Sequence, residues 1–191
     1  MSTARSMLRS LVLSLAGMVL VYLGVGSILA DQWHVDTTRT VAASAEQVGA
    51  LVRDFSSWKK WSTMEAQLGP QTTLEVAGEP GAVGQRMKWS GNQGLATLTM
   101  YAVAPGAVEY QFHSQGPEET QLLLRGKGRV EWVADGSGCR VHWHDEARWD
   151  SLAGRWIGWF GALQERVKEI QGTSLAGIER VVSESRQSPG K

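Results

Sequence analysis

QLLLRGKGRVEWV, residues 121–133, is the stretch of sequence that decides the fold. Successive side chains of a β-strand point to opposite faces, so this segment predicts a strand with one apolar and one charged face. The apolar face carries Leu122, Leu124, Gly126, Gly128, Val130 and Trp132, and the charged face carries Arg125, Lys127, Arg129 and Glu131. Such a strand is typical of an antiparallel sheet that buries one face and exposes the other. Glycines on the apolar face remove side-chain volume, which favours a bulge or a cavity.

The next strand candidate, CRVHWHDEARW (residues 139–149), contains a pattern that looks like a set of metal ligands. His142, His144 and Glu146 are spaced i, i+2, i+4, which places three possible ligands on one face of the strand. Arg140 and Arg148 flank them on that face, where they would repel a cation and could pair with the glutamate. We therefore predict a solvated charged face and no metal site.

The opposite face of this strand is apolar except for one carboxylate, Asp145. It alternates with Val141, Trp143, Ala147 and Trp149. A carboxylate in such surroundings must be hydrogen-bonded, paired or exposed to water, or its pKa must rise. Asp145 could orient the polar group of a ligand, act as a general base, or simply face water at the mouth of a cavity.

The remaining pattern from residue 32 onward predicts an α+β domain. Gly- and Pro-containing turns separate short strand candidates, as in an antiparallel meander, at residues 32–42, 72–76, 85–90, 95–103 and 108–114. Ser44 and Gln47 have the spacing of a capping box that begins a short helix. A long amphipathic helix from Ser151 to about Glu184 would cover the sheet with a stripe of Trp156, Trp159, Phe160, Leu163, Val167 and Ile170.

The N-terminus predicts one transmembrane helix. Residues 10–30 contain no charged side chain, and about 20 apolar helical residues are enough to cross a bilayer. Basic residues precede this run and acidic residues follow it, so residues 1–9 are expected in the cytoplasm and the domain on the extracytoplasmic (periplasmic) side of a single-pass protein. The alternative is a signal peptide cleaved after Ala30, which would give a secreted protein. Residues 185–191 are expected to form a flexible tail.

Composition excludes several classes of function. Acidic and basic residues balance to a formal net charge of zero, so the basic surface expected of a nucleic-acid-binding protein is missing. Cys139 is the only cysteine, which rules out an internal disulfide and a multi-cysteine metal cluster. The sequence contains no GxSxG, P-loop or HExxH motif, and we expect no cofactor.

The order of elements and several local features resemble a known family. These features are the pair Trp58 and Trp61, the segment KWSGNQG (88–94), the strand containing VHW, and the long C-terminal helix. Over residues 33–184 the chain resembles the SRPBCC superfamily, in its START-like, polyketide cyclase/dehydrase group. The resemblance implies a helix-grip fold, in which an antiparallel sheet wraps around the long C-terminal helix. It also implies an apolar cavity that holds a hydrophobic small molecule or lipid.

The candidate cavity lining combines the resemblance with the inward faces of the strands. It consists of Trp58, Trp61, Trp89, Tyr101, Tyr110, Phe112, Trp132, Trp143, Asp145 and Trp149. The aromatic residues could equally form an ordinary packed core. Trp58 and Trp61, with two lysines between them, could instead lie at a membrane surface.

Three functions follow from this interpretation. The first is a module that is anchored in the lipid bilayer through residues 10–30 and binds a hydrophobic small molecule or lipid. The second is an enzyme of cyclase or hydrolase type, with Asp145 and either Tyr101 or Tyr110 as acid–base groups. The third is a non-catalytic interaction domain at the cell envelope.

Overall fold

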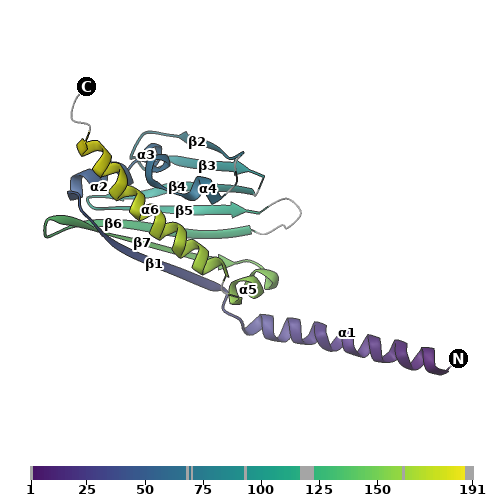
Figure 1. The fold of residues 1–191 in the computed structure, drawn as a ribbon. Helices are drawn as coiled ribbons and strands as arrows, with labels where there is room; N and C mark the ends of the chain where they lie inside the picture. The colour runs from purple at the N-terminus through teal and green to yellow at the C-terminus, as the bar shows by residue number, and fades with distance from the viewer. Residues whose placement is uncertain are drawn as a thin grey trace.

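The computed structural model describes residues 2–67, 69, 71–92, 94–116, 123–160 and 162–187. A long N-terminal helix, α1 (Ser2–Ile28), projects from an α+β domain (Figure 1). The strands are β1 (Gln32–Val41), β2 (Thr73–Ala77), β3 (Arg86–Gly91), β4 (Gly94–Ala104), β5 (Ala107–Gln115), β6 (Leu123–Asp135) and β7 (Gly138–Trp149). The other helices are α2 (Ala45–Val52), α3 (Phe55–Trp61), α4 (Met64–Gln67), α5 (Leu152–Trp159) and α6 (Ala162–Gln187).

The described strands form one antiparallel sheet in the order β1-β7-β6-β5-β4-β3-β2. Strands β2 to β7 are a meander, and β1 pairs with β7 to complete the sheet. Helix α6 crosses one face of it, as Figure 1 shows. The predicted α+β helix-grip fold is therefore confirmed. The predicted strand 121–133 corresponds to β6, and its first two residues lie outside the described part of the chain.

The short helices α2 and α3 pack against each other and against α6, and their buried side chains belong to the core. The predicted capping box is present, because the Gln47 backbone N–H donates to Ser44 Oγ at 3.2 Å and the Ser44 N–H donates to Gln47 Oε1 at 3.1 Å. Trp58 and Trp61 of α3 are fully buried, and their Nε1 groups donate to the carbonyl oxygens of Val52 and Leu51. The alternative of a membrane-surface position for these tryptophans is therefore wrong.

The predicted single helix from Ser151 to Glu184 is two helices. Ser151 caps α5 by accepting a hydrogen bond from the Gly154 N–H, and α6 begins at Ala162. The first half of the predicted apolar stripe does not cover the sheet, because Trp159 and Phe160 are 62% and 71% exposed. The second half does, with Leu163 and Val167 packed against the inner face. Helix α6 continues to Gln187, so residues 185–187 of the expected tail are helical, and 188–191 lie outside the described residues.

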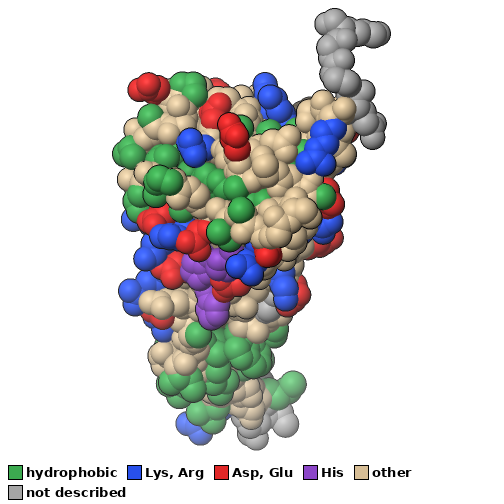
Figure 2. Space-filling model, turned by 90° about the vertical axis from the view of Figure 1, so that its left-hand side faces the viewer, with side chains coloured by type: hydrophobic (Ala, Val, Ile, Leu, Met, Phe, Trp, Pro, Cys, Tyr) green, Lys and Arg blue, Asp and Glu red, His purple; other side chains and the backbone are tan. Residues whose placement is uncertain are grey.

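Helix α1 is long and apolar enough to cross a membrane over Arg9–Ile28, judged by length and composition. Its leucines and valines from Leu11 to Leu23 are exposed, and little of the helix packs on the domain. Hydrophobic side chains accordingly gather at the lower end of the molecule in Figure 2, where α1 lies.

Candidate functional site

A pocket of about 200 Å³ lies between the inner face of the sheet and α6. Its walls are mainly apolar, with Trp89, Leu98 and Phe112 on the sheet side and Leu163, Val167 and Ile170 on the helix side. Asp145, Tyr110 and Gln171 supply polar atoms at its border. A mostly apolar pocket with a few convergent polar groups is the usual form of a small-molecule site.

The polar groups at the border form a continuous hydrogen-bonded chain. Trp143 Nε1 donates to Tyr110 Oη at 2.6 Å, and this hydroxyl donates to Asp145 Oδ1 at 2.6 Å. Gln171 Nε2 of α6 donates to the second carboxylate oxygen, Oδ2, at 2.8 Å. Thr37 of β1 donates to Gln171 Oε1 at 2.7 Å. The chain therefore joins β5, β7, α6 and β1 through a single carboxylate.

The register of the sheet explains how Tyr110 and Asp145 meet. Gly128 of β6 lies opposite Tyr110 of β5 on one side and Asp145 of β7 on the other. A Cβ atom at Gly128 would overlap both the Asp145 carboxylate and the Tyr110 ring. The missing side chain therefore lets Tyr110 reach across one strand to the carboxylate. Gly126 has the same role one step along, where Phe112 leans toward Ala147.

Burial changes the acid–base properties of this pair. Asp145 is 5% exposed, so the alternative that it faces water at a cavity mouth is wrong. Burial raises the pKa of its carboxyl above the ordinary value of 3.8, although hydrogen bonds from Tyr110 and Gln171 act to lower it. Burial, reinforced by the charge of Asp145, raises the pKa of Tyr110 well above its ordinary value. The hydroxyl therefore keeps its proton throughout the physiological pH range and donates to Asp145 Oδ1.

The structure brings only part of the predicted lining together. Trp89, Tyr110, Phe112 and Asp145 border the pocket of about 200 Å³. Trp58, Trp61 and Trp143 are buried and pack edge-on or tilted against one another, with ring centroids 4.9 to 5.8 Å apart. They belong to the solid part of the core.

Three further predicted residues lie away from the pocket. Trp132 packs at the opposite end of the sheet, where a Cβ atom at Gly49 of α2 would meet its indole. Trp149 lies against α5. Tyr101 is 42% exposed on the outer face, because it follows the inward-facing Met100 along the strand, and it lies at the register shift between Met100 and Ala102.

The sequence interpretation missed two residues with polar atoms that border the pocket, Gln171 and Trp33. Gln171 follows Val167 by four residues and so lies on the apolar stripe of α6, a signal of the same kind as Asp145 on its strand. Trp33 is 3% exposed and borders the pocket of about 200 Å³. Its Nε1 is the one buried side-chain nitrogen or oxygen without a hydrogen-bond partner in the described part of the chain.

The histidines of β7 lie on the outer face among charged side chains. Figure 2 shows histidine side chains surrounded by acidic and basic ones on the surface of the molecule. Both contact Asp36 Oδ1 of β1, at 3.0 Å from His142 Nε2 and 2.9 Å from His144 Nδ1. Glu146 pairs with Lys127 of the neighbouring strand at 2.9 Å rather than with the flanking arginines. Within the described residues, no group of three or more His, Cys, Asp or Glu side chains could hold a metal ion.

A known protein family matches most of the chain. The family model for polyketide cyclase / dehydrase and lipid transport matches residues 32–183, and the chain belongs to this family. The match agrees with the resemblance to the SRPBCC superfamily and extends over the whole sheet and nearly all of α6. No curated protein is similar enough in sequence to match.

Solved structures share the fold at low sequence identity. A protein from Rhizobium leguminosarum has a TM-score of 0.58 and 10% identity, with 80% of this chain and 95% of that one covered. A protein from Thermus thermophilus has a TM-score of 0.55 and 20% identity, covering 80% and 99%. Norcoclaurine synthase from Thalictrum flavum has a TM-score of 0.54 and 17% identity, covering 79% and 93%. At these identities the likeness establishes the fold alone.

Proposed function

We propose that the chain is a membrane-anchored module that binds a hydrophobic small molecule or lipid between its sheet and α6. The observation that carries the proposal is the apolar pocket of about 200 Å³ with the Tyr110–Asp145 pair at its border. Membership of a family described by cyclase, dehydrase and lipid-transport activities supports a hydrophobic ligand. Helix α1 supports the anchor, because its apolar surface is exposed over 20 residues.

Native mass spectrometry tests the binding. The full chain, extracted in mild detergent, should carry a hydrophobic molecule that is released when the protein unfolds. Ala96→Phe places a phenyl ring at the pocket wall and should abolish this adduct, since the ring would take up space that the ligand needs. Ala104→Phe is the matched control, because Ala104 is an exposed residue on the same strand outside the pocket. An unchanged adduct in Ala96→Phe would refute binding at this site.

The orientation of the anchor is part of the proposal. Arg9 precedes the apolar run and Asp31 follows it, which favours a cytoplasmic N-terminus and an extracytoplasmic domain. Protease added to cells whose outer envelope layer has been permeabilised, with the cytoplasmic membrane intact, should digest the domain and leave residues 1–9 protected. A mature chain that begins after Ala30 would instead establish cleavage and secretion.

An enzyme that uses Asp145 is the second candidate, and one observation favours it. A buried carboxyl with a raised pKa borders the pocket, where it could exchange a proton with a bound molecule. Tyr101 cannot assist there, because it lies on the other face of the sheet. Turnover of a bound molecule in the native chain, lost in Asp145→Asn with the adduct retained, would establish this role.

A further inference from the structure

The end of α5 carries a concentrated patch of exposed apolar side chains. Ile157, Trp159 and Phe160 are 40%, 62% and 71% exposed. Elsewhere in the described part of the domain, large exposed apolar side chains occur singly, at Val83, Tyr101 and Val133. The sequence from Trp156 to Leu163 contains no charged residue. Contiguous apolar patches of this kind mark interaction sites.

Helix α5 is fixed to the sheet by glycines. A Cβ atom at Gly154 or Gly158 would overlap the indole of Trp149, the last residue of β7. These two glycines are one turn apart and form a flat face on which the indole lies. Because this face is occupied by the domain, the aromatic residues of α5 are directed away from it.

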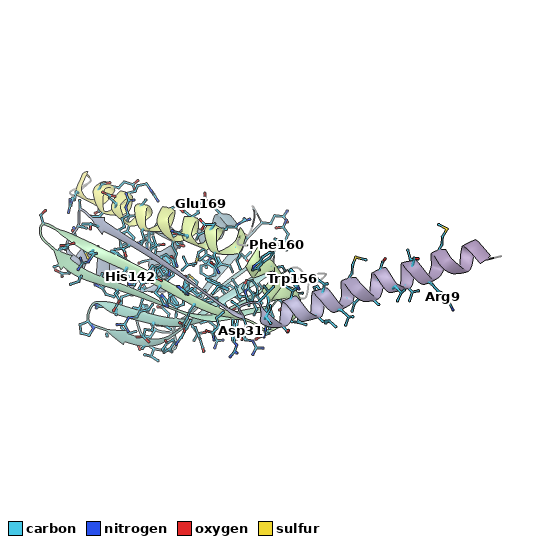
Figure 3. The ribbon with its side chains drawn as sticks, turned by 90° about the horizontal axis from the view of Figure 1, so that it is seen from below. Arg9, Asp31, His142, Trp156, Phe160 and Glu169 are labelled. Atoms are coloured by element: carbon cyan, nitrogen blue, oxygen red, sulfur yellow. The ribbon has the colours of Figure 1, made fainter. Side chains whose placement is uncertain are left out.

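Two of these aromatic residues, Trp156 and Phe160, face α1. Trp156 stacks on Tyr22 with ring centroids 5.8 Å apart, and its Nε1 donates to the Tyr22 carbonyl oxygen at 3.3 Å. Gly26 is the point of closest approach, since a Cβ atom there would meet Trp156 Nε1 at 2.8 Å. Arg155 donates to the Ser27 carbonyl oxygen at 3.2 Å near the C-terminal end of α1. Figure 3 shows Trp156 and Phe160 beside the domain end of α1, with Arg9 near its other end.

The position of these contacts along α1 determines how deep the tip of α5 would lie in a bilayer that surrounds α1. An open apolar groove of about 580 Å³ runs between the two helices. It is lined by Gly17, Met18, Val21, Tyr22, Trp156 and Phe160. At 1.5 Å per residue, Tyr22 lies about 9 Å and Gly17 about 16 Å from Ile28, the end of the apolar span. A bilayer that surrounds Arg9–Ile28 must therefore also surround the tip of α5.

From this geometry we infer that α5 is a membrane-inserted helix, which lies in the outer leaflet against α1 with Trp159 and Phe160 in contact with lipid. The inference rests on the membrane anchor of the proposed function. Lipid is the occupant that fits, because the groove is apolar on both walls and continues the lipid-facing surface of α1. Arg155 lies at the level of Ser27 and Asp31, where its charge can reach the headgroups while the tryptophans lie below it. Leu163, which borders the pocket of about 200 Å³, is held at the membrane surface as a result.

Site-specific fluorescence in lipid vesicles tests the inference on the full chain. The background is Cys139→Ala, which removes the single, buried thiol. An environment-sensitive label is placed at Phe160→Cys, at Trp159→Cys as a second α5 position, at Leu13→Cys within α1, and at Val133→Cys on the exposed sheet. Vesicles of phosphatidylcholine and phosphatidylglycerol are used with and without nitroxide-labelled lipid.

The labels on α5 and at position 13 should be blue-shifted and should lose most of their emission when nitroxide lipid is present, whereas the label at 133 should be unaffected. Quenching at 13 without quenching at 159 and 160 would overturn the membrane insertion of α5 and leave the anchor standing. No quenching at any position would overturn the anchor and the inference together, and would leave the ligand proposal to the mass-spectrometric test.

Discussion

Removing the Tyr110 hydroxyl tests whether the buried hydrogen-bonded chain is as consequential as its geometry indicates. In Tyr110→Phe, Trp143 Nε1 loses its acceptor and Asp145 Oδ1 loses its donor, both at 2.6 Å and both away from water. A buried polar group left without its partner costs about 1–3 kcal/mol, and more where the group is charged. With two groups affected, the free energy of unfolding should fall by roughly 3 kcal/mol at neutral pH. Tyr101→Phe is the control, because that hydroxyl belongs to a half-exposed side chain on the outer face, and it should change stability by less than about 0.5 kcal/mol.

The pH dependence of this cost sharpens the test. The pKa of Asp145 is higher in the folded protein than in the unfolded chain. The stability that Asp145 contributes is therefore fully present below its pKa in the unfolded chain, and it is lost as the pH rises through its pKa in the folded protein. Tyr110→Phe removes the strongest interaction that lowers this pKa, so the loss should extend to higher pH, at about 1.4 kcal/mol for each unit of further shift. Urea unfolding followed by circular dichroism at pH 5 and pH 8, in detergent, measures the difference.

Tyr110→Phe should therefore cost more at pH 8 than at pH 5, and less in an Asp145→Asn background, where no buried charge loses its donor. A cost below about 1 kcal/mol at both pH values would refute the reasoning, since it would mean that water or another donor replaces the hydroxyl. An Asp145→Leu background separates the two partners, because only Trp143 then loses a hydrogen bond to the hydroxyl. If Tyr110→Phe costs as much in that background as in the native chain, the penalty belongs to Trp143 alone and the role assigned to the carboxylate is wrong.

Two further predictions concern α6 and the outer face. Gly172→Ala should stabilise the protein by up to about 1 kcal/mol, because no atom lies within 4 Å of the added Cβ. Gly177→Ala should instead destabilise it by roughly 1–3 kcal/mol, because the added Cβ overlaps the Trp61 carbonyl oxygen. Thermal unfolding of both variants gives the comparison, and equal effects on stability would contradict it. The hydrogen bond to His144 lowers the pKa of Asp36, and the same contact raises the pKa of His144 against the opposing effect of burial. Asp36→Asn should therefore lower the pKa of His144 in an NMR titration and destabilise the fold by at most about 1 kcal/mol. This loss of stability should be present between the pKa of Asp36 and the pKa of His144 and should fade above the pKa of His144. An unchanged titration of His144 would disprove the pairing.

The sheet was predictable from sequence because alternation along a strand is a local property. Alternation placed Trp143 and Asp145 on the inner face and His142 and His144 on the outer one, as the structure has them. It could not reveal Asp36, which meets the histidines only because β1 pairs with β7 after more than a hundred intervening residues. Tyr101, by contrast, was misplaced although alternation with the inward-facing Leu98 and Met100 puts it on the outer face, as the structure has it.

The break between α5 and α6 was hidden because both helices have apolar residues at helical spacing. The sequence cannot show that one stripe packs on the sheet while the other packs on α1. A signal was nevertheless present in Gly154 and Gly158, one turn apart on a short helix. Glycines at that spacing weaken a helix unless close packing requires them, and here they receive the indole of Trp149.

Asp145 illustrates why a carboxylate can persist in an apolar core. Apolar residues of the same shape at Tyr110, Asp145 and Gln171 would avoid the cost of desolvation, so stability alone does not account for the network. The network does fix one position of α6 relative to β7, because Gln171 meets Asp145 Oδ2 in a single register of helix on sheet. It also keeps hydrogen-bonding atoms at the border of a pocket whose other walls are apolar. Under the proposed function, both effects serve a site that must hold its shape while it recognises a polar group on an otherwise hydrophobic molecule, and this is the physical reason to include Asp145 in that proposed site.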